Sequence, residues 1–128
     1  MRVIISNNKL RKSLETERDR TKTFGADMAK KIAMRISLLE EADSLADFWP
    51  PKSLPERCHE LQGERKGTFS IDLKHPFRLL FIPVEEEQEG KEAESKQPVP
   101  EQQGADAELD RWRSIKTVDI TSIEDTHG

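Results

Sequence analysis

Alternating apolar and polar positions predict a pair of strands in the middle of the chain. Residues 67–73 carry apolar side chains at every second position, so one face of this strand is predicted to be buried and the other exposed. Residues 77–84 are predicted as the next strand. Its positions predicted to face the core are Phe77, Leu79 and Phe81, and those on the opposite side are Arg78 and Leu80.

Three further stretches complete the strand prediction. Residues 2–5 have β-branched character, residues 57–62 precede the central pair, and residues 114–123 alternate imperfectly but still favour a last strand. Residues 74–76 connect the central pair as a short hairpin turn, so a turn role for His75 is favoured over a catalytic one.

Two helices are predicted before these central strands. The helix over residues 6–21 is mostly charged and should lie on the surface, with Leu10 and Leu14 as its apolar contacts. The helix over residues 26–42 follows a break at Gly25. Its apolar residues are spaced three and four apart, which favours packing on the sheet over a cofactor role; they are Ala29, Ile32, Ala33, Ile36 and Leu39.

The order of these elements predicts an α+β fold. An N-terminal strand and a helical hairpin are expected to pack on an antiparallel sheet of about four to five strands. Residues 43–56 contain three prolines among apolar residues, which predicts a loop pinned to the core, with Trp49 packed rather than stacked on a base. The 128 residues suit a single domain.

Residues 85–110 have the composition of a disordered insertion, rich in Glu, Gln, Gly and Pro. A solvated loop is favoured, and shielding of a basic face stays open as the alternative. This segment carries 10 acidic against 2 basic residues, whereas residues 1–84 carry 16 Lys and Arg against 12 Asp and Glu. The net charge of −4 therefore comes from the acidic segment, whereas residues 1–84 are basic, which suits a polyanionic partner.

Other features of the composition narrow the class of protein. No apolar run is long enough to cross a bilayer and the N-terminus lacks a signal-peptide core, so a cytoplasmic protein with no membrane partner is expected. The single Cys58 has no partner for an intramolecular disulfide, and the three His show no metal-ligand spacing. We therefore expect neither a metal site nor a cofactor.

The segment from Arg57 to Val84 concentrates the candidate chemistry. It places a cation-rich set on strands and turns whose other positions are apolar, which predicts display on the open face of a sheet. The set comprises Arg57, His59, Arg65, Lys66 and Arg78.

The block CHELQGERKGTFSIDLKHPFRLLF, together with the terminal IEDTHG, closely resembles the HigB-like (proteic killer) branch of the RelE/ParE toxin superfamily. The shared features are a block of the form H-x-L-x-G-x-R-x-G, a strand with an Arg before aliphatic residues, and a D-Y-H-type terminus. The resemblance covers essentially all of the chain outside the acidic insertion. It implies a RelE-like order of strand, helices and sheet.

This resemblance implies a toxin of a type II toxin-antitoxin system that acts as a ribosome-dependent mRNA endoribonuclease. The expected partners are the ribosome, mRNA and a HigA-like helix-turn-helix antitoxin, with operator DNA reached only through the antitoxin. The reaction would be attack of a ribose 2′-OH on the adjacent phosphate. Such an attack needs a base, cations for the phosphorane charge and an acid for the leaving 5′-oxygen.

The resemblance also assigns roles residue by residue. His59 matches the motif histidine, an acid or base; Arg65 and Arg78 match its arginines, whose guanidinium forks suit phosphate. The predicted catalytic residues are His59, Arg65, Arg78 and His127, and the predicted RNA contacts are Arg57, Lys66, Asp125 and Thr126.

Two departures from the family pattern keep a rival hypothesis open. Thr126 stands where a tyrosine is expected, and Gln62 stands where some relatives have a lysine. The rival is a non-enzymatic toxin-like protein, either a DNA gyrase poison of the ParE type or a degenerate toxin that only binds its antitoxin. For single residues, His59 as a hydrogen-bonded sheet residue and Arg65 and Lys66 as ordinary turn charges are the alternatives.

Overall fold

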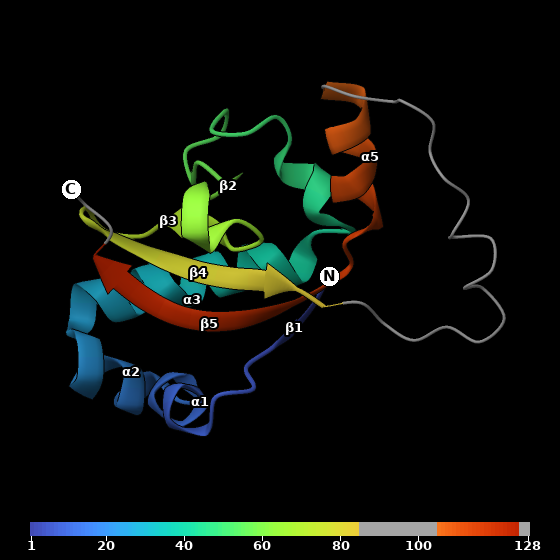
Figure 1. The fold of residues 1–128 in the computed structure, drawn as a ribbon. Helices are drawn as coiled ribbons and strands as arrows, with labels where there is room; N and C mark the ends of the chain where they lie inside the picture. The colour runs from blue at the N-terminus through green and yellow to red at the C-terminus, as the bar shows by residue number, and fades with distance from the viewer. Residues whose placement is uncertain (85–104, 126–128) are drawn as a thin grey trace, which may run out of the picture.

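A five-stranded sheet forms the centre of the protein, shown in Figure 1 as a computed structural model that describes residues 1–84 and 105–125. The strand order is β1-β5-β4-β3-β2, and helix α3 crosses behind β4 and β5 in this view. The strands are β1 (Arg2–Ile4), β2 (His59–Glu60), β3 (Phe69–Asp72), β4 (Phe77–Pro83) and β5 (Thr117–Asp125). The α+β class predicted from the order of elements is confirmed.

The sheet is mixed rather than purely antiparallel. Strands β2, β3, β4 and β5 pair antiparallel, but β1 pairs with β5 in parallel, with Val3 opposite Val118. The first strand therefore lies beside the last one and not beside the next strand along the chain. Parallel neighbours cannot be joined by a tight turn, and here the connection from β1 to β5 contains the helices and the other three strands.

The first predicted helix is divided in two. Its residues form α1 (Asn8–Leu14) and α2 (Glu17–Phe24), followed by α3 (Ala26–Glu41). Thr16 is extended, and its hydroxyl oxygen accepts a hydrogen bond from the Asp19 backbone N–H at 3.1 Å, which begins a new helix. Gly25 separates α2 from α3 with a φ of 89°, a region that favours glycine.

Helix α3 packs on the sheet as its apolar stripe predicts. Ile32 and Leu39 are fully buried, and the core joins them to strand residues on one face of the sheet. The strand members of this core include Phe69, Ile71, Leu79, Phe81, Val118 and Ile120. The face of the sheet that carries these residues is called the core face below, and the other is called the outer face.

Helix α5 (Ala105–Ser114) was not predicted, and it corrects two expectations. Residues 105–110, expected as the end of a disordered insertion, are helical, and the last strand begins at Thr117 instead of residue 114. Trp112 is fully buried, with its ring centroid 5.1 Å from that of Trp49 and 5.5 Å from that of Phe69. One large aromatic thus anchors a helix whose charged composition suggested disorder. The expectation for residues 85–104 lies outside the described residues.

Phe77 lies on the same face of β4 as Leu79 and Phe81, as predicted, but it is not buried with them. Leu79 and Phe81 are buried on the core face, but Phe77 is 38% exposed because it lies at the start of the strand, next to the turn that contains His75. Leu80, on the outer face, is fully buried as well. Part of the outer face is therefore covered.

Candidate functional site

Alternating charges form a row across the outer face of the sheet. Asp72 of β3 lies opposite Arg78 of β4, and Arg78 lies opposite Glu124 of β5. Residues opposite one another in a sheet share a face, so these three side chains emerge on the same side. Arg57 extends the row at the Asp72 end and Arg65 extends it at the Glu124 end. We call these five residues the charged row.

Carboxylates engage each arginine of the charged row. Arg78 Nε lies 3.0 Å from Asp72 Oδ1, and Arg57 Nε lies 3.5 Å from Asp72 Oδ2. Arg65 donates two hydrogen bonds to Glu124, from Nη1 to Oε1 and from Nη2 to Oε2, each 3.0 Å long. The structure therefore brings together three predicted site residues, and it places between them two carboxylates that sequence analysis did not assign to the site.

The Arg65 end of the row also explains the burial of Leu80. Arg65 ends the short 3-10 helix η2 (Gly63–Arg65) between β2 and β3, yet its side chain reaches β5, beyond both β3 and β4. The loop that contains η2 must therefore cross the outer face. The Arg65 and Ser122 hydrogen bonds hold the pKa of Glu124 below its ordinary value, so this carboxylate stays ionised at neutral pH.

A second row, next to the charged one, contains the predicted histidine. His59 of β2 lies opposite Ser70 of β3, followed by Leu80 of β4 and Ser122 of β5. Each member of this second row lies two residues along the chain from a member of the charged row, which is a distance of about 7 Å in a strand. Ser70 and Leu80 are fully buried, whereas His59 and Ser122 are partly exposed. The row is therefore accessible at its two ends, and His59 lies at one of them.

The ring of His59 is oriented by the backbone of Arg57. Nδ1 of His59 lies 2.8 Å from the Arg57 carbonyl oxygen. A carbonyl oxygen only accepts hydrogen bonds, so Nδ1 carries the proton and Nε2 of the neutral ring keeps its lone pair. Burial lowers the pKa of His59, with Lys52 and Arg78 adding to the effect and the Arg57 carbonyl opposing it. At neutral pH the ring is therefore suited to act as a base.

The backbone of Arg57 is in the left-handed region, with a φ of 51°. This conformation is uncommon for a residue other than glycine and is found where surrounding contacts enforce it. It interrupts the extended chain before His59. Strand β2 contains only His59 and Glu60 and not the whole predicted stretch 57–62. As a result the Arg57 carbonyl lies at His59 while its guanidinium lies at Asp72.

Glu60 fixes the loop that contains η2. Its side chain, 8% exposed, accepts a hydrogen bond from the Gly67 backbone N–H at 2.8 Å and another from Arg111 of α5 at 2.8 Å. The Arg111 hydrogen bond is the main cause of the lowered pKa of Glu60. Because Gly67 lies just beyond Arg65, these contacts hold the loop in the position from which Arg65 reaches Glu124. No sequence signal marked Glu60 for this role.

The other predicted site residues lie apart from the two rows or outside the described part. Lys66 is exposed at the end of η2. Asp125 follows Glu124 in β5 and is opposite Phe77, so it alternates to the other side of the strand. His127 and Thr126, predicted as a catalytic residue and an RNA contact, lie outside the described residues. Cys58 is buried, and burial, together with Glu56, raises the pKa of its thiol.

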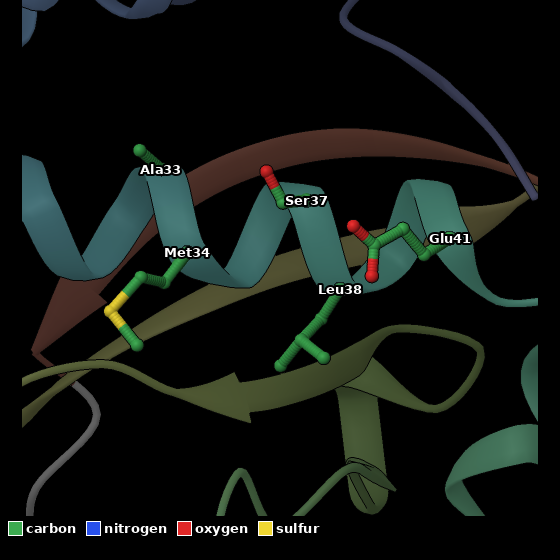
Figure 2. Close-up of a pocket in the computed structure, with 5 residues that line it drawn as sticks. All are labelled: Ala33, Met34, Ser37, Leu38 and Glu41. Atoms are coloured by element: carbon green, nitrogen blue, oxygen red, sulfur yellow. The ribbon is translucent and has the colours of Figure 1, made fainter.

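Two surface hollows lie on helices, away from both rows. One, of about 510 Å³, is lined by Glu17, Arg18, Thr21 and Lys22 of α2. The other, of about 430 Å³, lies along α3, where Met34 is 52% exposed and extends from the helix beside Leu38 (Figure 2). Neither of these two hollows includes a member of the charged row.

In residues 1–84 and 105–125, no group of three His, Cys, Asp or Glu side chains is arranged to hold a metal ion, and no helix has the length and apolar character needed to cross a bilayer. Comparisons with protein-family models, with curated proteins and with solved structures found no match.

Proposed function

We propose that the protein is an mRNA endoribonuclease of the HigB-like kind, acting on the ribosome as the toxin of a type II toxin-antitoxin system. The observation that carries the proposal is the state of His59. Its ring is neutral at neutral pH, is oriented through Nδ1, and lies on the same face as Arg57 and Arg78. A base beside guanidinium groups is what attack by a ribose hydroxyl requires. The resemblance of the central block supports the same reaction.

In this mechanism Nε2 of His59 takes the proton from the ribose 2′-OH. The 2′-oxygen then bonds to the adjacent phosphorus, and the bond from phosphorus to the 5′-oxygen breaks, leaving a cyclic phosphate and a 5′-hydroxyl. Arg78 and Arg57 stabilise the negative charge that develops on the phosphoryl oxygens. His127 is the proposed acid that returns a proton to the leaving 5′-oxygen.

The proposed partners are those that the resemblance to HigB-like toxins implies. The basic residues of the folded part favour approach to the phosphates of mRNA and ribosomal RNA. A HigA-like helix-turn-helix antitoxin is the proposed inhibitor, operator DNA is reached only through it, and the cytoplasm is the proposed compartment.

One observation favours a second function, that of a toxin-like protein without nuclease activity. Asp72 engages Arg57 and Arg78, and Glu124 engages Arg65, so the cations proposed to hold phosphate already have anionic partners. A face neutralised in this way stabilises a phosphorane less than free guanidinium groups do. Such a protein would bind its antitoxin, or poison gyrase, and leave mRNA whole.

Cleavage on translating ribosomes decides between the two functions. Purified protein should cut mRNA in a ribosome-dependent reaction mapped by primer extension, and His59→Ala or Arg78→Ala should abolish the cuts. The matched controls are His75→Gln in the hairpin turn and Arg113→Ala on α5, which should cut at the wild-type rate. If the wild-type protein leaves mRNA intact, the nuclease hypothesis is rejected. Expression in cells then separates the remaining two: growth arrest with DNA damage indicates gyrase poisoning, and normal growth indicates a degenerate toxin.

A further inference from the structure

We infer that Asp72 and Glu124 determine how the charged row binds phosphate: they occupy the guanidinium groups that phosphates would use, so an RNA backbone binds by displacing these carboxylates. The inference deepens the proposed function and rests on it for the identity of the anion. It makes Asp72 and Glu124 specificity-determining residues of the same site. They favour a polyanion with several phosphates over an isolated anion.

The backbone of Asp72 is held on both of its polar groups. The Asp72 backbone N–H donates to the Glu56 carbonyl at 2.7 Å, and the Asp72 carbonyl accepts from Nε of the buried Arg35 at 2.8 Å. These two hydrogen bonds fix the backbone at the end of β3, and the Asp72 side chain lies between Arg57 and Arg78. A phosphate that approaches Arg57 or Arg78 must therefore compete with the Asp72 carboxylate for the guanidinium group.

The two ends of the row differ in exposure. The Asp72 and Arg78 side chains are 24% and 26% exposed, whereas the Arg65 and Glu124 side chains are 47% and 37% exposed. An ion pair in water is screened and contributes little, while a partly buried pair is screened less. The Arg65–Glu124 pair is bidentate, but water and ions reach it more easily, so we place the first entry of a phosphate at the Glu124 end.

Exchange of anions has a measurable consequence for salt dependence. A single strand that binds free cations releases about 0.7 counterions for each phosphate neutralised. A carboxylate released from an arginine recovers its own counterion, which cancels part of that release. The charged row contains three arginines and two carboxylates. The slope of log affinity against log salt concentration should therefore be that expected for about one phosphate contact, not for about three.

The test uses a single-stranded RNA with 2′-O-methyl groups throughout, which cannot be cleaved, and needs no ribosome. Its affinity is measured for the full chain at salt concentrations from about 50 to 200 mM. Asp72→Asn should bind about tenfold more tightly at the lowest salt, with a salt slope steeper by about 0.7. Glu124→Gln should bind about threefold more tightly, since its ion pair is more exposed.

The matched control is Asp110→Asn, which removes the same charge from an exposed ion pair with Arg113 on α5. It should change the affinity less than about twofold. The inference is overturned if Asp72→Asn binds no better than wild type, if it gains no more than the control, or if none of the proteins binds the RNA. Thermal denaturation checks folding; if Asp72→Asn is unfolded, the salt slope of Glu124→Gln decides.

This measurement is separate from the test of cleavage. Tighter binding by Asp72→Asn together with intact mRNA in the ribosome assay would reject the nuclease and keep the exchange of anions. Normal cleavage together with unchanged binding by both variants would keep the nuclease and reject the exchange.

Discussion

Replacing Trp112 by alanine should remove α5 from the core. The side chain is fully buried, and its ring contacts those of Trp49 and Phe69 edge-on. Truncation of a buried Trp to Ala costs about 3 to 5 kcal/mol, and each aromatic pair contributes about 0.5 to 1.5 kcal/mol beyond its buried area. Trp112 Nε1 has no hydrogen-bond partner among the described residues, which offsets part of this contribution. We therefore expect a loss of about 3 to 4 kcal/mol, a large share of the stability of a domain of this size.

Urea denaturation followed by far-ultraviolet circular dichroism measures this loss without relying on the fluorescence of the deleted indole. Trp112→Phe is the matched control; it keeps an aromatic ring and removes the unpaired N–H, so its loss should stay below about 1.5 kcal/mol. A loss below about 1 kcal/mol for Trp112→Ala would refute the reasoning, because α5 would then contribute little to the core.

Two further predictions concern charge at the site. Burial, Lys52 and Arg78 lower the pKa of His59. The acid limb of the pH-rate profile for cleavage should therefore lie below pH of about 6.5, the pKa of an unperturbed imidazole, and Lys52→Gln should move this limb to higher pH. A wild-type limb above this pH would contradict the assignment of His59 as the base. Arg111 lowers the pKa of Glu60 in the folded protein, so Glu60 binds a proton more readily in the unfolded chain than in the folded one. The stability that the ionised Glu60 contributes is therefore present above pH of about 4.3 and is lost as the pH falls through the folded-state pKa. Urea denaturation across that range should show a flatter pH dependence for Glu60→Gln, and identical curves would exclude the effect.

Local periodicity predicted the parts of the fold in which burial follows the backbone repeat. The stripe on α3 is buried at Ile32 and Leu39, and Phe69 and Ile71 of β3 are buried as expected. Ser70 between them, predicted to be exposed, is fully buried as well, so burial in β3 does not alternate. Prediction was wrong where one residue outweighs its surroundings. Thr16 begins a new helix inside a stretch with good helical composition, and Trp112 anchors a helix among charged residues.

The candidate site was predictable in part for the same reason. Alternation places Arg78 on the outer face, away from Leu79 and Phe81, and the structure agrees. The partners of the arginines were not predictable, because they depend on strand register and on the path of the η2 loop. Asp72 and Glu124 are far apart in the sequence, and only the pairing of both strands with β4 places them on either side of Arg78.

The pairing of β1 with β5 determines when the sheet can assemble. Strand β5 lies between β1 and β4, so the pair that joins Val3 to Val118 closes a loop of almost the whole chain. Contacts between residues so distant in sequence form slowly, because the entropy of closing the loop is lost before the contacts are gained. A nascent chain that ends before β5 leaves β1 without a partner and β4 with an open edge. Shortening the chain from its C-terminal side would therefore remove an inner strand and separate β1 from β4, whereas loss of the three-residue β1 would remove only an edge.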